Sequence, residues 1–165
     1  MLAMLAGALV TIAETSYIGR LGTFPLAGIA LVFPMVMLQQ MISAGSMGGG
    51  ISSAISRAIG AGDSEKADRL VMHALVISLG LGIVYSLIFL IWGREIFAAI
   101  GGSGLALDEA MAYANVAFAG AITIWLTNAF ASAIRGSGNM KTPSTVLMLV
   151  AIGQVVLGGT LGLGI

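Results

Sequence analysis

The stretch ETSYIGRLGTFPLAG (residues 14–28) joins two apolar segments through a short turn that contains glycine and proline. It places a single carboxylate, Glu14, at the end of the first apolar segment. A charged residue at the centre of a bilayer costs about 2.5–3.5 kcal/mol, so such residues usually serve a function. We therefore expect Glu14 to take part in the chemistry of this protein.

Long stretches without Asp, Glu, Lys or Arg extend outward from this turn. Only 8% of the 165 residues are charged, 58% are hydrophobic, and the mean hydropathy is +1.05. A soluble domain would carry about a quarter of charged residues. Each uncharged stretch exceeds the ~20 residues that a helix needs to span a bilayer. The pattern predicts an all-α, polytopic transmembrane bundle, and the uncharged stretches are residues 21–56, 70–93, 110–134 and 142–165.

About five helices are expected from these stretches and from the glycine-rich segments between them. The first apolar segment is short, and the last one continues to residue 165 without a polar loop. We therefore expect the chain to be part of a longer protein of transporter size. Gly45 and Gly49 have the spacing that lets two membrane helices pack closely. The expected helices cover about residues 1–17, 25–56, 70–92, 109–134 and 143–165.

The composition argues against several classes of function. The formal net charge is zero, whereas a nucleic-acid-binding protein needs a basic face. The chain has no Cys and one His, which excludes disulfides, thiolate metal sites and a second histidine for catalysis. Lys141 lacks the directly preceding glycine of a phosphate-binding loop. We expect no enzyme activity, no metal, no cofactor and no nucleic-acid partner.

The basic residues predict how the helices are oriented. The connections after the second and fourth expected helices lie on one side of the membrane and hold five Lys and Arg residues, against two on the other side. Loops rich in Lys and Arg remain in the cytoplasm. We therefore expect the loops at 56–69 and 135–142 to be cytoplasmic, and Glu14 to lie toward the outer leaflet.

Three segments resemble the multidrug and toxic compound extrusion (MATE) transporters. YIGRLG (17–22), followed by LAG (26–28), is similar to their connection between the first and second helices. SRAIGAGD (56–63) is similar to the loop between their second and third helices, and RGSGNMKTP (135–143) to the turn before their fifth. The resemblance covers nearly the whole chain, but only about five of the twelve helices of that family.

The resemblance implies an antiporter that exports organic cations in exchange for protons or sodium ions, with no other cofactor. Its fold would consist of two six-helix lobes that open alternately to either side of the membrane. This chain would form most of the first lobe. The implied location is the bacterial inner membrane, where the partners are membrane lipids and the second lobe of the same protein.

The resemblance also implies a coupling site. The family usually has an aspartate in its first helix at the position of Glu14, and many members have Asn and Asp in the fifth helix at the positions of Gln154 and Gly158. This chain therefore keeps one carboxyl and one amide, and Glu14 with Gln154 is the expected pair for proton or cation coupling. The alternative for Glu14 is a solvated interfacial carboxylate that Arg20 neutralises.

Gln40 and Asn115 are polar residues within expected spans, and they are the candidates for the substrate pathway. Hydrogen bonding between helices is the alternative role for each of them. Two other functions also remain open for the whole protein. One is a flippase for lipid-linked oligosaccharides, although its anionic substrate would call for basic residues within the spans. The other is a membrane scaffold that transports nothing.

Overall fold

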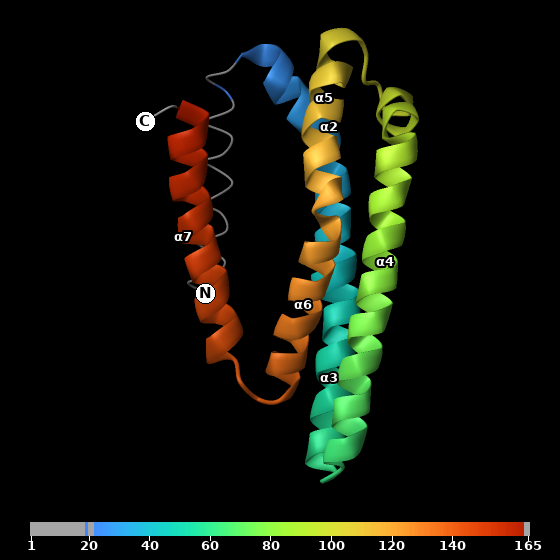
Figure 1. Ribbon diagram of the computed structural model, residues 1–165, viewed down its shortest axis with the longest axis vertical. Coiled ribbons are helices and arrows are strands. Elements are labelled where there is room, and N and C mark those ends of the chain that lie inside the picture. Colours follow the sequence, from blue (N-terminus) through green and yellow to red (C-terminus); the bar gives the residue numbers. More distant parts are fainter. Residues whose placement is uncertain (1–18, 20–21, 164–165) are drawn as a thin grey trace.

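The chain folds into a bundle of long antiparallel helices in the computed structural model, which describes residue 19 and residues 22–163, with side chains except at Gln154 and 157–163. Every element in these residues is helical, which confirms the all-α prediction. The expected helix at 1–17 lies outside the described residues. Figure 1 shows α2, η1 and α3 as one continuous span beside α4, with α5 and α6 returning along them and α7 turning back beside α6. The elements are α2 (Thr23–Gln40), the π-helix η1 (Met41–Met47), α3 (Gly48–Gly60), α4 (Ser64–Ala99), α5 (Gly104–Ala119), α6 (Ala121–Gly136) and α7 (Lys141–Leu163).

The span formed by α2, η1 and α3 is longer than predicted and is wound differently at its centre. The sequence predicts an unbroken helix over 25–56, whereas the structure extends it over Thr23–Gly60 and includes η1. Buried positions along it follow helical spacing except for one step of five residues, from Ser43 to Gly48. The i→i+5 hydrogen bonds of a π-helix accommodate such a step, so the same side of the span remains buried before and after η1.

Two glycines end helices at the turns that the sequence predicts. Gly62 (φ 76°) follows α3, and Gly138 (φ 88°) follows α6. In both turns the glycine N–H donates to the carbonyl three residues earlier, and the next N–H donates to the carbonyl five residues earlier, at 2.9–3.3 Å. Glycine adopts this left-handed conformation without steric cost, so residue type fixes where these helices stop.

α4 extends beyond the predicted 70–92 at both ends. Its first turn forms because the Asp63 carboxylate accepts the backbone N–H of Lys66 at 2.9 Å. Gly93 does not interrupt it, since this glycine is buried against Phe97 and a methionine of α5. The helix stops only at Gly101, where φ is 104°.

α5 and α6 replace the single helix that the sequence predicts over 109–134. They begin earlier, at Gly104, and meet at a 44° bend around Gly120. Glycine weakens a helix locally, and here the Gly120 carbonyl accepts both the N–H and the hydroxyl of Thr123, at 3.1 and 2.6 Å. These tighter bonds turn the chain and leave one broken span in place of a straight one.

The helices pack through an aromatic cluster near one end. Phe89 of α4 stacks on Phe118 of α5 with their ring centroids 4.2 Å apart, and Val32 of α2 and Phe97 of α4 belong to the same buried group. Lipid tails are as apolar as these side chains, so their burial from water does not drive helix association inside a membrane. Close packing and hydrogen bonds must therefore stabilise the bundle.

The closest approach of α3 and α6 uses small residues in a different register from the predicted one. No described atom lies within 4 Å of a Cβ built on Gly45 or Gly49. A Cβ on Gly48 would instead lie 2.6 Å from the Ser132 hydroxyl, and one on Gly136 would lie 2.9 Å from the Ser52 carbonyl oxygen. The five-residue step at η1 turns Gly48, rather than its neighbours, toward α6.

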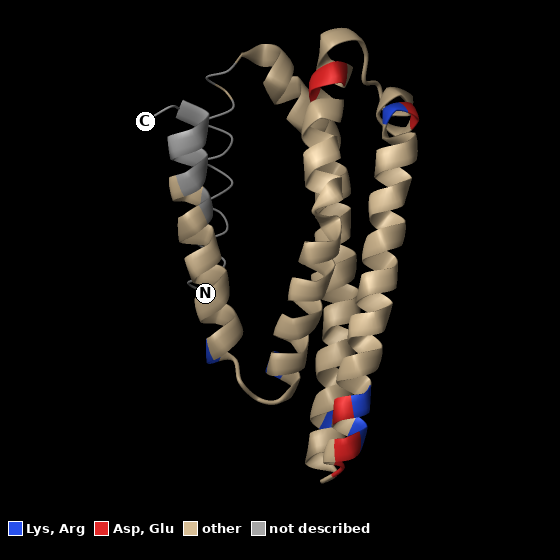
Figure 2. Ribbon diagram, viewed as in Figure 1, with Lys and Arg blue, Asp and Glu red and all other residues tan. Residues whose placement is uncertain are grey.

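Charged residues gather at the two ends of the bundle (Figure 2). Two helical segments, Thr23–Gly60 and Ser64–Ala99, are long and apolar enough to cross a membrane, and the bent pair of α5 and α6 would make a third crossing. The loops after α3 and α6 lie at the same end, where most of the basic residues gather. That this end faces the cytoplasm stays a prediction from the charge pattern.

Candidate functional site

Four neutral polar side chains meet halfway along the span of α2, η1 and α3. We call them the mid-span polar cluster: Gln39 and Gln40 at the end of α2, Ser43 in η1, and Asn128 in α6. The Asn128 amide nitrogen donates to Gln40 Oε1 at 3.1 Å and to Ser43 Oγ at 2.8 Å. The cluster therefore connects two spans that are distant in sequence.

The inner half of the cluster is fully buried and satisfies backbone groups. Gln39 is 1% exposed, and its Nε2 donates to the carbonyl of Ala121 at 3.3 Å, directly after the bend between α5 and α6. Ser43 is 0% exposed, and its hydroxyl donates to the Gln39 carbonyl at 2.7 Å. In a bilayer no water is present to take these hydrogen bonds, so this half fixes the geometry of both distortions.

The outer half of the cluster is open to a ligand. Gln40 is exposed and Asn128 is half-buried. An amide both donates and accepts hydrogen bonds, and it carries no charge at any physiological pH. No Asp, Glu, Lys or Arg occurs at 21–56 or 110–134, which contain the cluster. The cluster can therefore bind or orient a substrate, but it cannot itself take up a proton.

The structure places the four predicted site residues in different ways. Gln40 lies in the cluster. Asn115 lies on α5 with an exposed side chain, 13 residues before Asn128 and on the far side of the Gly120 bend, and it makes no hydrogen bond to the cluster. Gln154 lies on α7, but its side chain is outside the described part, and Glu14 lies outside the described residues.

Sequence reasoning did not select Gln39, Ser43 or Asn128 as site residues. A usable signal was present, because Gln39, Gln40 and Ser43 have the spacing of neighbours on one helix within an uncharged stretch. Another contact had no such signal. The Tyr85 hydroxyl of α4 donates to the Met35 carbonyl of α2 at 2.6 Å, and a backbone acceptor leaves no trace in residue types.

A small cavity of about 180 Å³ lies between α6 and α7. It is mostly apolar, and Thr127, the neighbour of Asn128 in the chain, is part of its wall. Its volume would hold a ring or a short alkyl group rather than a whole drug-sized molecule. The cavity is lined by Thr127, Phe130, Ala131, Ile134, Thr142, Pro143, Val146 and Leu147.

Long apolar spans, charges at their ends and a neutral polar cluster at mid-span define a multi-pass helical membrane protein. The model of one family, described as MatE, matches residues 1–159. The chain belongs to this family, the MATE transporters, whose members are membrane transporters rather than enzymes.

Curated relatives support the same family. The chain is 28% identical over 155 residues to a FAD transporter of Shewanella oneidensis, covering 94% of this chain and 34% of that protein. It is 28% identical over 148 residues to the probable multidrug resistance protein YoeA of Bacillus subtilis, covering 86% and 32%. The chain therefore spans about a third of the length of the curated relatives it matches.

Solved structures show the same arrangement of helices. A crystal structure of a MATE point mutant matches with a TM-score of 0.91 at 34% identity, over 96% of this chain and 35% of that one. An outward-facing multidrug resistance MATE transporter matches with a TM-score of 0.83 at 33% identity, over 96% and 35%. A transporter of the wider MOP superfamily from Pyrococcus furiosus matches with a TM-score of 0.84 at 34% identity, over 96% and 35%.

Proposed function

We propose that the protein containing this chain is an antiporter of the bacterial cytoplasmic membrane that exports organic cations in exchange for protons or sodium ions, by alternating access. The observation that carries this proposal is the mid-span polar cluster, where Gln40 and Asn128 offer hydrogen-bonding groups on otherwise apolar spans. A neutral site accepts an organic cation without the repulsion that a basic side chain would impose. The apolar cavity beside Thr127 suits the hydrophobic part of such a substrate.

The absence of basic residues from the spans bears on the substrate class. One relative is named as a FAD transporter and another as a probable multidrug resistance protein. A flavin dinucleotide carries two phosphates, which proteins typically bind through Arg or Lys. The four uncharged stretches of this chain supply neither. This favours an organic cation over an anionic nucleotide, and equally over a lipid-linked oligosaccharide, for the part of the pathway that this chain forms.

The coupling role falls on Glu14 in this proposal. The chain has seven acidic residues, and Glu14 is the one that precedes residue 63. The other six lie at or near the ends of the described helices: Asp63, Glu65, Asp68, Glu95, Asp108 and Glu109. Proton uptake by Glu14, with the Gln154 amide as its expected partner, would release the cationic substrate, because the site then loses its negative charge.

Flux measurements on the full-length protein test this proposal. Vesicles containing the purified protein are loaded with a fluorescent organic cation such as ethidium, and a proton or sodium gradient is imposed. We expect Glu14→Gln to reduce gradient-driven flux at least about tenfold, because the variant cannot change charge, as positioned acid–base groups commonly contribute 10²–10⁴-fold. Glu65→Gln is the matched control, since Glu65 is exposed and pairs with Arg69 outside the spans, and it should keep the wild-type flux.

The two gradients also identify the coupling ion. Flux driven by only one of them assigns that ion. Undiminished flux in Glu14→Gln would show that this residue is not the coupling group. Wild-type protein that moves ethidium under neither gradient would contradict cation export, and it would return the scaffold as the better interpretation.

A further inference from the structure

A second pocket lies at the end of the hairpin between α3 and α4, away from the mid-span polar cluster. Its volume is about 370 Å³. Arg57 of α3 and Lys66 of α4 contribute basic side chains to it, and Asp63 contributes the carboxylate that caps α4. Leu70 and three alanines form its apolar wall. We call it the hairpin pocket.

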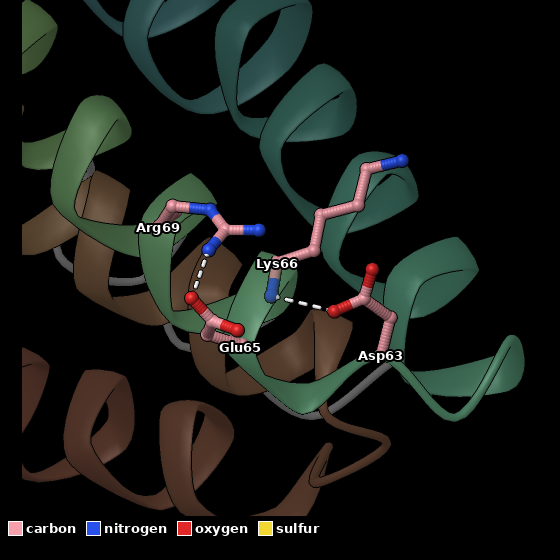
Figure 3. A network of polar contacts seen from close by, with 4 residues as sticks. All are labelled: Asp63, Glu65, Lys66 and Arg69. Carbon is pink, nitrogen blue, oxygen red and sulfur yellow. Dashed lines mark hydrogen bonds and ion pairs between the residues drawn. The ribbon is translucent and has the colours of Figure 1, made fainter.

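The two cations of the hairpin pocket have no anionic partner among the described residues. Arg57 donates through Nη1 to the Ser53 hydroxyl, which is neutral. The ion pairs within the described residues are Arg69 with Glu65 and Arg94 with Asp108, so Lys66 belongs to neither. Figure 3 shows the Lys66 side chain extending away from the Glu65–Arg69 pair.

Asp63 does not neutralise this pair of cations completely. One of its oxygens, Oδ1, accepts the backbone N–H of Lys66 at 2.9 Å. The pocket therefore contains two positive side chains and one negative side chain, and a single negative charge would balance it. A phosphate diester carries that charge, and it accepts several hydrogen bonds from a guanidinium and an ammonium group.

The depth of the pocket matches the headgroup region of a bilayer. The uncharged stretch 70–93 of α4 rises about 36 Å at 1.5 Å per residue, which slightly exceeds a ~30 Å hydrocarbon core. Leu70 thus lies at the edge of the hydrocarbon, and Lys66, one turn earlier, lies among the headgroups. This end of the bundle is also the one predicted to face the cytoplasm, where anionic lipids attract basic segments.

We propose that the hairpin pocket binds the headgroup of an anionic phospholipid such as phosphatidylglycerol. Arg57 and Lys66 bind its phosphate diester, and Leu70 contacts the start of an acyl chain. The bound lipid links the end of α3 to the start of α4 and holds this hairpin at the leaflet surface. This assignment is independent of the transported substrate and of the coupling ion.

Native mass spectrometry of the full-length protein tests the site by titration with phosphatidylglycerol. We expect Arg57→Gln with Lys66→Gln to weaken retention of the tightest lipid at least about tenfold, since each basic residue near a membrane surface contributes about 1 kcal/mol. Arg69→Gln is the matched control, because it removes one positive charge from the same segment but outside the pocket. It should change retention by less than about threefold, as its charge is already paired.

Three further measurements make the result decisive. The charge-preserving variant Arg57→Lys with Lys66→Arg should retain the lipid, which separates loss of charge from loss of fold. Phosphatidylcholine, whose headgroup has no net charge, should bind weakly to the wild-type protein. Soluble glycerol 1-phosphate should also bind weakly, because it lacks the acyl chain that Leu70 contacts. Equal loss in Arg69→Gln, no loss in the double variant, or equally tight binding of glycerol 1-phosphate would overturn the proposal.

Discussion

A single amide side chain, Asn128, joins α6 to two elements of the neighbouring span. Its nitrogen is shared between Gln40 of α2 and Ser43 of η1, at 3.1 and 2.8 Å. Ser43 in turn donates to the backbone of α2, so the loss of one residue alters a chain of hydrogen bonds rather than one contact. Within a membrane no water replaces the lost donor. Asn128 should therefore matter for stability as well as for any ligand that meets Gln40.

We expect Asn128→Ala to lower the free energy of unfolding of the full-length protein by about 0.6–1.7 kcal/mol, the range measured for such bonds in membrane proteins. The matched control is Asn115→Ala, the same substitution at an exposed amide of the same broken span. It should change stability by less than about 0.5 kcal/mol. Thermal denaturation in detergent, followed by the fraction of protein that remains monodisperse, measures both. An equal loss for the two variants would show that the cluster has no special weight.

At the scale of elements, helix association depends on glycines that allow backbones to touch. Gly28 of α2 is one of them, since a Cβ there would lie 2.7 Å from the backbone nitrogen of Ala110 and 2.8 Å from Glu109 Cβ. Backbone atoms cannot rotate away as a flexible side chain would. The contact therefore fixes how closely α2 and α5 approach.

We expect Gly28→Ala to destabilise the full-length protein by about 1–3 kcal/mol, the usual cost of overpacking. Gly80→Ala provides the comparison, because no described atom lies within 4 Å of a Cβ on Gly80. That variant should be neutral or more stable by up to about 1 kcal/mol, as alanine is the better helix former. The same denaturation measurement applies. If Gly28→Ala were as stable as Gly80→Ala, the approach of α2 and α5 would have to be looser than the structure shows.

At the scale of the whole molecule, the loops alternate between two ends with different charge. The loop after α4 and the loop after α6 lie at opposite ends of the bundle (Figure 1). Each contains an exposed serine, Ser103 and Ser137, and the chain has no cysteine. Serine and cysteine are similar in size, so single replacements give matched reporters of sidedness.

We expect Ser103→Cys to react with a membrane-impermeant maleimide on intact cells, because the loop after α4 should face outward. Ser137→Cys should react only after the cells are permeabilised, because the loop after α6 belongs to the predicted cytoplasmic side. Both variants are made in a full-length protein without other cysteines. The opposite pattern would invert the orientation. It would also remove the cytoplasmic leaflet from the argument for the hairpin pocket.

The sequence predicted the class of fold because charge is so costly in a bilayer that it marks the ends of spans. It also predicted the turns at Gly62 and Gly138, where only glycine fits the backbone readily. It did not predict the π-helix at Met41–Met47 or the bend at Gly120, since both depend on how neighbouring helices pack. For the same reason it found Gln40 but not its contact with Asn128.

The five-residue step from Ser43 to Gly48 makes the length of η1 matter more than its composition. Each residue turns an α-helix by about 100°. A chain with one residue fewer in this segment could wind as a plain α-helix, but everything after it would face a different neighbour, and Gly48 would no longer meet Ser132. Homologous sequences should therefore exchange residues within 41–47 more readily than they gain or lose one. In an alignment, η1 is a place where letters vary and gaps do not.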